Sequence, residues 1–349
     1  MRTPQIRLAA LALVTALASA TAAQDLTLSN KANGTLKFAV IGDSGTGDRN
    51  QYRLAKVFTD MHQRFQYEFV LMLGDNMYGS ENSRDFQRKF EIPYKPVLDK
   101  GVKFYAALGN HDSTNQSKYK LFNMNGERFY TFRPKQGVRF FALDSNYMDR
   151  TQLQWLEKEL AQSGSDWKIM YFHHPIYSSG GRHGSDTALR DQLEPLFLKY
   201  GVDVVMAGHE HFYERLKPQK GIHYFISGGA GKLRKGDVGG TFTEKAFDTG
   251  FHFMIFEIDG DQMHFQTISD QEKTVDSGIV ARRRVDDKAA PSVPAAPSVK
   301  PVPPQDKPGT TTAKPSAPAT AKPAAPTTAK PAPATAKPAA PSTAKPAAK

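Results

Sequence analysis

The sequence predicts an α/β fold in which mixed β-sheets are flanked by helices, and two observations carry this prediction. Apolar, β-rich runs alternate with amphipathic stretches through the middle of the chain, as in α/β proteins. Near residue 260, two apolar runs flank Asp259-Gly260-Asp261, a strong hairpin signal, so part of the sheet is expected to be antiparallel. A third observation concerns chemistry: several of the apolar runs are followed by Gly and then by Asp, Asn or His.

The expected elements follow from local pattern and from the residues that bound them. In chain order, strands are expected at 36–41, 69–73, 102–108, 138–143, 168–172, 202–207, 224–227, 251–258 and 262–268, with further strands around 129–132. Helices are expected at 49–64, 82–91, 151–162 and 186–200. Thr151 is the expected N-cap of the third helix, and Gly201 the expected C-terminal stop of the fourth.

The formal net charge of +11 lies at the two ends of the 349-residue chain. Residues 24–281 carry equal numbers of acidic and basic side chains, whereas residues 291–349 hold eight Lys against the single Asp306. The charge therefore gives no reason to expect a nucleic-acid partner. We expect three segments: a signal peptide over 1–23, a folded domain over 24–284 and a disordered Lys/Pro/Ala-rich repeat tail over 285–349.

The first 23 residues have the pattern of a secretory signal. Arg2 and Arg7 precede or open an apolar stretch, Leu8 to Ala20, and small residues around Ala22 suit a signal peptidase. This stretch is shorter than the roughly 20 residues that cross a bilayer. A buried N-terminal helix is the alternative, although no cap or amphipathic stripe accompanies the stretch. We therefore expect export, to a periplasm or out of the cell.

The C-terminal segment contains 16 of the 23 prolines and repeats Thr-Ala-Lys-Pro five times. Frequent proline disfavours helix and sheet, and Ala, Thr and Lys bury too little apolar area to fold. The basic tail is expected either to contact an anionic cell wall or membrane surface, or to be a solvated spacer without a partner.

Five of the expected strands are followed by residues that bind hard metal ions. The motifs are Gly42-Asp43, Gly74-Asp75 with Tyr78, Gly109-Asn110, His173, and Gly208-His209 with His211. Ligands bind at the carboxyl ends of strands in open α/β sheets, because adjacent strand ends converge there. The chain has no cysteine, which excludes disulfides, thiolate ligands and a cysteine nucleophile. Seven oxygen and imidazole donors are too many for one tetrahedral ion, so the sequence predicts a site with more than one ion.

Each of these motifs has a structural interpretation when it is taken alone. A Gly-Asp pair after a strand is commonly a turn, and His62, His174, His223, His252 and His264 are expected to be structural. Asp144 is expected to cap a loop or to orient a neighbour. In an extended His209-Glu210-His211 both imidazoles would point to one side, and the same alternation would turn His174 away from His173. The metal site is favoured because five motifs occur together, each at the end of a strand.

Taken together, the motifs resemble those of the calcineurin-like metallophosphoesterases. The resemblance is carried by Gly42-Asp43-Ser44-Gly45, Gly74-Asp75-x-x-Tyr78, Gly109-Asn110-His111-Asp112, His173-x-Pro175 and Gly208-His209-x-His211, and it covers roughly residues 36–270. Within that superfamily the chain resembles the purple acid phosphatases, because a tyrosine stands at Tyr78. Its compact single-domain body resembles the small, animal-type members and their bacterial relatives. His183 lies one residue further from His173 than its counterpart does in the animal enzymes.

The resemblance implies a sandwich of mixed sheets with a binuclear metal site at the strand ends. One ion, Fe³⁺, would be bound by Asp43, Asp75, Tyr78 and His211. A second ion, Fe²⁺, Zn²⁺ or Mn²⁺, would be bound by Asp75, Asn110, His173 and His209, with Asp75 bridging. His111 and His183 are the implied catalytic residues, acting on the phosphoryl oxygens and the leaving group.

The implied activity is that of an acid phosphatase that hydrolyses small phosphate monoesters by attack of a metal-activated hydroxide. A phosphodiesterase or nucleotidase of the same superfamily is the nearest alternative. A non-catalytic surface-binding protein that retains a hydrolase body is the alternative from another class, and secondary redox chemistry at an iron site is a third. The sequence does not fix the oligomeric state, the natural substrate or the divalent metal.

Overall fold

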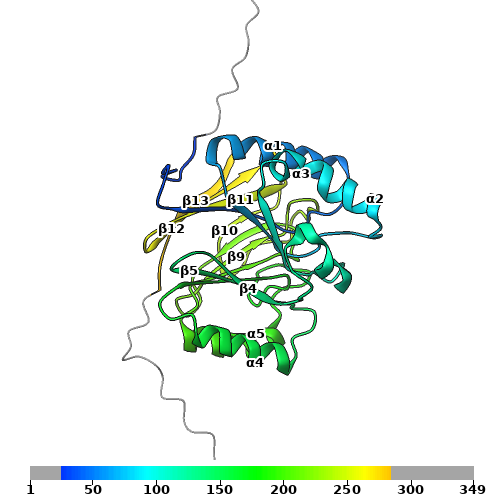
Figure 1. Ribbon diagram of the computed structural model, residues 1–349. Coiled ribbons are helices and arrows are strands. Elements are labelled where there is room, and N and C mark those ends of the chain that lie inside the picture. Colours follow the sequence, from blue (N-terminus) through cyan, green and yellow to red (C-terminus); the bar gives the residue numbers. More distant parts are fainter. Residues whose placement is uncertain (1–24, 284–349) are drawn as a thin grey trace, which may run out of the picture. The chain divides into compact units, whose positions relative to one another are not determined.

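The computed structural model describes residues 25–283, so the predicted signal peptide and the predicted tail lie outside the described residues. Within residues 25–283 the strands form one sheet of six strands and one of seven, and helices cover the outer face of each sheet (Figure 1). The predicted α/β fold with mixed sheets flanked by helices is confirmed. None of the helices in this range is long and apolar enough to cross a membrane.

The six-stranded sheet joins a parallel half to an antiparallel half. In spatial order its strands are β13 (Thr274–Ala281), β12 (Gln262–Ser269), β11 (His252–Asp259), β1 (Leu36–Ile41), β2 (Phe69–Met72) and β3 (Lys103–Ala106). β1, β2 and β3 run parallel, whereas β11 to β13 form an antiparallel meander that pairs with β1. The predicted hairpin lies between β11 and β12, where Asp259 pairs with Gln262 and Gly260 takes a φ of 59°.

The seven-stranded sheet is parallel at its centre. In spatial order its strands are β10 (Thr243–Phe247), β8 (Tyr213–Leu216), β9 (His223–Ser227), β7 (Val204–Ala207), β6 (Trp167–Phe172), β5 (Val138–Ala142) and β4 (Tyr130–Lys135). β5, β6, β7 and β9 run parallel, and β4, β8 and β10 pair antiparallel at its margins. The carboxyl ends of parallel strands in both sheets thus become available for one site.

The helices lie in the connections between strands. They are α1 (Arg49–Phe65), α2 (Ser83–Phe86), a π-helical turn η1 (Gln87–Glu91), α3 (Ile92–Leu98), the 3₁₀ turns η2 (Thr114–Lys118) and η3 (Lys120–Phe122), α4 (Arg150–Ala161) and α5 (Thr187–Tyr200). α1 and α3 pack on the six-stranded sheet, and α4 and α5 pack on the seven-stranded sheet (Figure 1). Asp48 caps α1 by accepting hydrogen bonds from the backbone N–H groups of Asn50 and Gln51.

Period-two burial explains why β1 is apolar at every position but one. Phe38 and Val40 pack into the core between the two sheets, whereas Ala39 and Ile41 pack under α1 and α3. A strand covered on both faces needs apolar side chains on both, which is why β1 is one of the strands whose predicted bounds match the structure.

Several local predictions need correction. Thr151 does not cap α4, because Asp149 precedes the helix in an extended conformation and accepts the N–H of Gln152 at 2.9 Å. The helix predicted at 82–91 continues through η1 and α3 to residue 98, although α3 contains Pro93 and Pro96. The prolines are tolerated because the π-helical turn precedes them and side chains of α1 donate to the backbone oxygens of Arg88 and Lys89. Gly201 does end α5, with a φ of 68°. β8, β10 and β13 were not predicted.

Candidate metal centre

The structure brings the five predicted motifs to one edge of the two sheets. Asp43 follows β1, Asp75 follows β2, Asn110 follows β3, His173 follows β6 and His209 follows β7. Asp43, Asp75 and His209 have positive φ values of 56°, 50° and 68°, so the chain turns sharply directly after each of these strands. These turns point the side chains toward a common centre.

Two glycines allow the strand ends to approach one another. Gly74 has a φ of 89°, and a Cβ atom there would lie 2.6 Å from Nδ1 of His173. A Cβ on Gly109 would lie 2.2 Å from the backbone nitrogen of Asp75. A side chain at either position would push two of the motifs apart, which explains why glycine precedes the candidate donors here.

Three donors form a group that we call the tyrosine cluster: Asp43, Tyr78 and His211. The hydroxyl of Tyr78 donates to Oδ1 of Asp43 at 3.1 Å and lies 3.3 Å from Nε2 of His211. Nε2 of His211 is 3.4 Å from Oδ1 of Asp43. Burial raises the pKa of Tyr78, and the Asp43 and Asp75 carboxylates add to this shift, so a phenolate forms here only beside a compensating positive charge.

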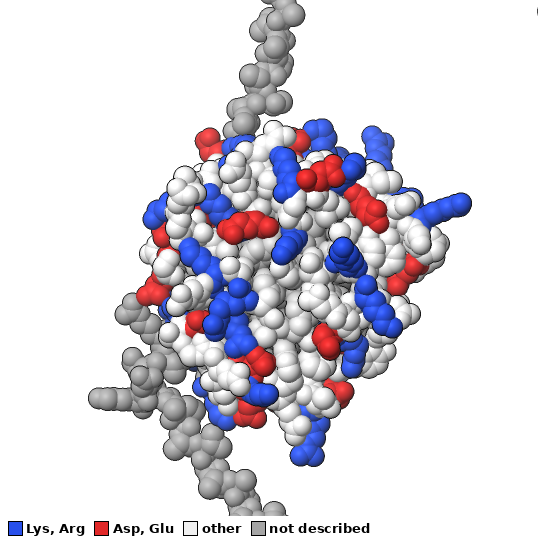
Figure 2. Space-filling view, viewed as in Figure 1, with Lys and Arg blue, Asp and Glu red and all other residues white. Residues whose placement is uncertain are grey.

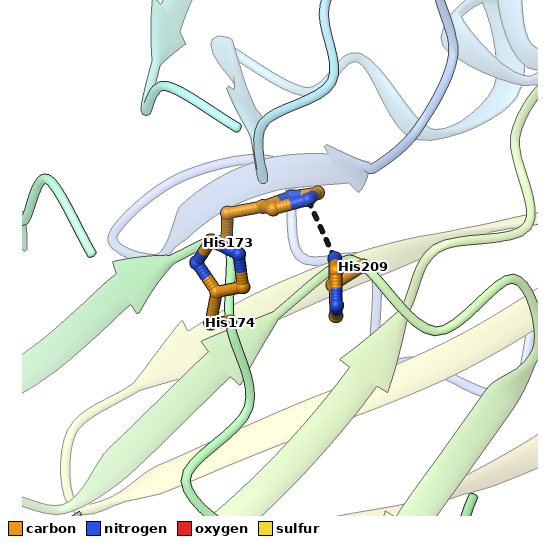
Figure 3. A group of neighbouring side chains, drawn as sticks. All are labelled: His173, His174 and His209. Atoms are coloured by element: carbon orange, nitrogen blue, oxygen red, sulfur yellow. Dashed lines mark hydrogen bonds between the residues drawn. The ribbon is translucent and has the colours of Figure 1, made fainter. Parts of the chain in front are cut away.

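Three further donors form a group that we call the asparagine cluster: Asn110, His173 and His209. Oδ1 of Asn110 lies 3.0 Å from Nε2 of His173 and 3.0 Å from Nδ1 of His209. The two ring nitrogens are 3.1 Å apart (Figure 3). Nδ1 of His173 donates to the backbone oxygen of Leu73 at 2.9 Å, which leaves the lone pair of Nε2 directed at the cluster.

Asp75 lies between the two clusters. Its Oδ1 is 3.4 Å from Nε2 of His173 in the asparagine cluster, and its carboxylate also interacts with the Tyr78 hydroxyl in the tyrosine cluster. Oδ1 also accepts the backbone N–H of His111 at 3.0 Å. Asp75 is therefore placed to share its carboxylate between two ions.

The donor set fits metal ions in geometry and in charge. Atoms bonded to one ion at about 2.1 Å, with bond angles of about 90–110°, lie about 3.0–3.4 Å apart, which is the spacing within both clusters. Donor atoms of Asp43, Asp75 and His173 all lie within 4.8 Å of one another, as do those of His173, His174 and His209. Burial raises the pKa of Asp43 and lowers the pKa of His173, and a bound cation offsets both penalties by interacting with carboxylate and neutral imidazole.

The structure corrects the expected path of two histidine-containing segments. His209-Glu210-His211 is not extended, because His209 adopts the left-handed conformation; both imidazoles nevertheless reach the centre, His209 through Nδ1 and His211 through Nε2. Strand geometry also stops at Phe172, so His174 is not turned away from His173. The two rings lie 4.9 Å apart, and the His174 ring is 4.5 Å from that of His209 (Figure 3).

Glu210 is a supporting residue that the sequence did not reveal. Its side chain is fully buried, accepts the backbone N–H of Gly184 at 2.9 Å and pairs with Arg234 at 2.8 Å. The backbone N–H of Arg234 in turn donates to the carbonyl oxygen of His211 at 2.9 Å. Glu210 thus ties the loop that carries His183 to the segment that carries His209 and His211. Nothing in a single Gly-His-Glu-His motif indicates a partner that lies 24 residues later.

Asp112 supports the centre from the other side. It accepts the backbone N–H groups of Gly109 at 2.8 Å, Asn76 at 3.0 Å and Met77 at 2.9 Å. These bonds fasten the turn that holds Asn110 to the turn that follows Asp75. Burial and the Asp75 carboxylate raise the pKa of Asp112 to about 7. Asp112 lies within the motif Gly109-Asn110-His111-Asp112, but no role was predicted for it.

The two predicted catalytic histidines lie on opposite sides of the centre. His111 is exposed, and its ring packs against Tyr78 with 4.9 Å between ring centres. The His183 ring lies 4.3 Å from the His209 ring, and Nη2 of Arg234 donates to Nε2 of His183 at 3.3 Å. Burial and the charges of Arg234 and Arg182 lower the pKa of His183. Lys232 adds another cation, 4.6 Å from the centre of the Tyr78 ring.

The charged side chains on one face of the molecule do not form a single-sign surface. Lys and Arg alternate with Asp and Glu over the face shown in Figure 2. Asp144 has the structural role that was expected, since it pairs with Arg128 and accepts the N–H of Asn146 at 3.1 Å. His252 is fully buried and structural as well, packed against Tyr213 and Phe247.

Comparisons with known proteins point to one family. The sequence model of the calcineurin-like phosphoesterases matches residues 36–213. Rabbit (Oryctolagus cuniculus) tartrate-resistant acid phosphatase type 5 is 29% identical over 239 residues, which cover 56% of this chain and 73% of the rabbit protein. Purple acid phosphatase 17 of Arabidopsis thaliana is 28% identical over 246 residues, covering 60% of this chain and 72% of that protein.

Among solved structures, GAP50, the anchor in the inner membrane complex of Plasmodium, superposes with a TM-score of 0.62. The superposition covers 74% of this chain and 93% of the Plasmodium protein, at 20% identity. At that identity the likeness establishes a shared fold and nothing further.

Proposed function

The chain belongs to the calcineurin-like phosphoesterase family and is a phosphoric monoester hydrolase like its acid phosphatase relatives; we propose that it is exported and works with two metal ions. The convergence of the tyrosine and asparagine clusters on Asp75, at the carboxyl edge of both sheets, supports the two metal ions. The proposed export rests on the signal-like sequence pattern of residues 1–23.

We assign the residues of each cluster to one ion, with Asp75 shared. Asp43, Tyr78, His211 and Asp75 offer phenolate and carboxylate oxygens, which suit Fe³⁺. Asn110, His173, His209 and Asp75 offer two imidazoles, an amide oxygen and a carboxylate, which suit Fe²⁺, Zn²⁺ or Mn²⁺. When bound, the ions would supply an activated water and neutralise charge on the phosphate.

The chain's own residues supply orientation and proton transfer. His111, exposed beside Tyr78, is placed to donate a proton to the leaving oxygen of the ester. His183, held by Arg234 on the asparagine side, is placed to bind a phosphoryl oxygen. Glu210 and Asp112 hold the two loops that carry these histidines, so that neither side chain has to be ordered when substrate binds.

Elemental analysis and an absorption spectrum of protein purified without added metal test this proposal, followed by assays with a monoester and a bis-ester. We expect two ions per chain, a visible band from a tyrosinate–iron contact, and faster hydrolysis of the monoester. Preference for the bis-ester would instead favour the phosphodiesterase alternative. A metal-loaded protein inert toward both esters would overturn the assignment as a phosphatase.

A non-catalytic role deserves the same test, because GAP50 of Plasmodium shares the fold and is described as an anchor. A body retained only as a scaffold has no need to keep its donors together. In this chain all seven predicted donors converge at one edge, with supporting contacts from Glu210 and Asp112, which favours catalysis.

A further inference from the structure

A wide groove adjoins the metal centre at His111, whose ring packs against Tyr78 of the tyrosine cluster. Its volume is about 850 Å³, within the range of sites that hold organic ligands, and it is bordered by residues that follow Tyr78 and Asn110. Besides His111 and Asp112, the aromatic residues Phe86 and Tyr119 and the cation Lys118 line the groove.

The aromatic pair Phe86 and Tyr119 is held in place by packing and hydrogen bonding. The Phe86 and Tyr119 rings lie 4.1 Å apart at an interplanar angle of 32°, and both side chains are half-buried. Tyr119 donates its hydroxyl to Glu91 at 2.6 Å, and its ring also contacts Phe122. The two rings therefore present a fixed apolar surface to the groove. A ligand that covers this surface removes it from water, which makes binding more favourable.

The polar wall of the groove is equally fixed. Glu81 accepts the backbone N–H of Ser113 at 2.7 Å and the side-chain amide of Gln116 at 2.9 Å. The Glu81 carboxylate therefore already has its hydrogen-bond partners among the residues of the groove wall. Lys118 is exposed at the rim, so the groove offers a ring surface and one cation.

We propose that this groove is the subsite for the leaving group of the substrate, and that it selects esters whose leaving group carries an aromatic ring. The inference rests on the proposed phosphatase function. A leaving oxygen must lie within reach of its proton donor, and His111 lines the groove, so the organic group attached to that oxygen extends toward Phe86 and Tyr119. The aromatic pair is then the surface on which the ring packs.

A second cavity beside the metal centre provides the contrast. Its volume is about 440 Å³, and it is lined by Asn110, Asn146, Tyr147, His174 and Asp186 among others. It contains neither His111 nor a pair of packed rings, and neither Lys nor Arg lines it. Its single aromatic side chain, Tyr147, is 59% exposed. This cavity therefore lacks both the proton donor and the ring platform.

The test uses esters that differ by a ring but share an alkoxide leaving group: benzyl phosphate and ethyl phosphate. Benzylphosphonate and ethylphosphonate serve as matched, non-hydrolysable competitors. With the full-length, metal-loaded protein we expect benzyl phosphate to have a KM about 3- to 10-fold lower than ethyl phosphate, the range that a packed aromatic pair supports. The inhibition constants of the two phosphonates should differ in the same direction.

Phe86→Leu removes the ring but keeps the apolar volume, and Tyr147→Leu makes the matched change in the second cavity. Phe86→Leu should abolish the preference for the benzyl over the ethyl compounds, whereas Tyr147→Leu should leave the preference in place. A preference that survives Phe86→Leu, or that disappears in Tyr147→Leu alone, overturns the assignment of this groove.

Failure of the proposed function can be told apart from failure of the subsite. If neither ester is hydrolysed, the phosphatase function is wrong, and the subsite is then judged by calorimetric binding of the two phosphonates to wild type and Phe86→Leu. Equal affinities of wild type for both phosphonates overturn the subsite, whether or not the esters are hydrolysed.

Discussion

The two halves of the candidate metal centre are built from different donors, although each takes one histidine from the chain after β7. The tyrosine cluster takes Asp43 from the chain after β1, Tyr78 from the chain after β2 and His211 from the chain after β7, so two of its three donors are oxygen atoms. The asparagine cluster takes Asn110 after β3, and His173 and His209 after β6 and β7, so nitrogen predominates. Asp75 interacts with both clusters, through Nε2 of His173 in one and the hydroxyl of Tyr78 in the other.

This difference matters because oxygen-rich and nitrogen-rich sites favour different ions. An ion bound at the tyrosine cluster would have a phenolate ligand that burial disfavours, and would therefore have to be highly charged. The asparagine cluster contributes neutral imidazoles and an amide, which suit a divalent ion. If the two clusters are independent sites joined by one carboxylate, they should bind two ions of different charge.

The largest expected effect comes from removing that carboxylate. Asp75→Asn should release both ions, since it takes one ligand from each cluster, and turnover should fall by roughly 10⁴-fold or more. Asn110→Ala should release only the divalent ion, because Asn110 belongs to a single cluster. Elemental analysis of both variants and of the surface control Asp60→Asn checks this. Equal metal loss in Asp75→Asn and Asn110→Ala would show that the clusters are one cooperative unit.

His111→Gln should reduce turnover without changing the metal content. The ring packs on Tyr78 but is not part of either cluster, so the expected loss is that of a proton donor, roughly 10²–10⁴-fold. An ester with a good leaving group needs little protonation of that group. The turnover of such an ester should therefore fall much less in His111→Gln, which gives an internal control. Loss of an ion along with activity would place His111 among the ligands.

How far the sequence reached can be judged from these same residues. Asp43, Asp75, Asn110, His173 and His209 were placed after strands by short-range pattern, and the structure brings them together because parallel strand ends share an edge. Whether they bind metal stays a prediction. The supporting residues Glu210 and Arg234 could not be paired from sequence, since their contact depends on how two loops fold back over each other.

Position in the sheet explains why two of the missed strands, β10 and β13, were not predicted. β1 is buried on both faces and is therefore unbroken by polar residues, whereas β13 lies at the edge of its sheet and has five polar or small residues among its eight. Edge strands need apolar side chains on one face at most, so local pattern marks them weakly. The misplaced cap at Thr151 has a similar cause: Asp149 and Thr151 are both good caps, and the path of the preceding loop decides between them.

Tyr78→Phe separates the clusters spectroscopically. Iron should remain bound through Asp43, Asp75 and His211, while the tyrosinate–iron absorption band disappears, and turnover should fall less than in Asp75→Asn. The absorption spectrum and iron content together make the measurement, with Tyr147→Phe as a control tyrosine outside both clusters. A band that persists in Tyr78→Phe would assign it to another donor.

His252, a buried histidine outside both clusters, is expected to make the free energy of unfolding depend on pH. Burial lowers the pKa of His252 to about 4, and a smaller opposing effect comes from the backbone of Gly250. The folded state therefore binds the proton less well than the unfolded state, whose pKa is about 6.5. This contribution to stability is complete above about pH 6.5 and is lost as the pH falls toward 4, by about 3 kcal/mol.

His252→Phe should remove that dependence. The free energy of unfolding of the variant should change less than that of wild type between pH 6.5 and pH 4, as measured by denaturant titration at a series of pH values. His264→Phe, at a half-buried position on β12, is the matched control and should leave the slope in place. An unchanged slope in His252→Phe would mean that the ring is protonated inside the fold.

The smallest effect is expected from the part of the chain with the most charge. Residues 24–281 carry no net charge and residues 291–349 carry an excess of seven positive charges, yet every candidate donor and both predicted catalytic histidines lie in the former. If the ions held by the two clusters supply the attraction for phosphate, deleting residues 291–349 should leave kcat/KM for a small ester, and its dependence on salt, unchanged. The deletion should instead weaken binding to an anionic polymer or to anionic vesicles. A large fall in kcat/KM, strongest at low salt, would instead mean that the positive charge of residues 291–349 attracts the substrate before it reaches the two clusters.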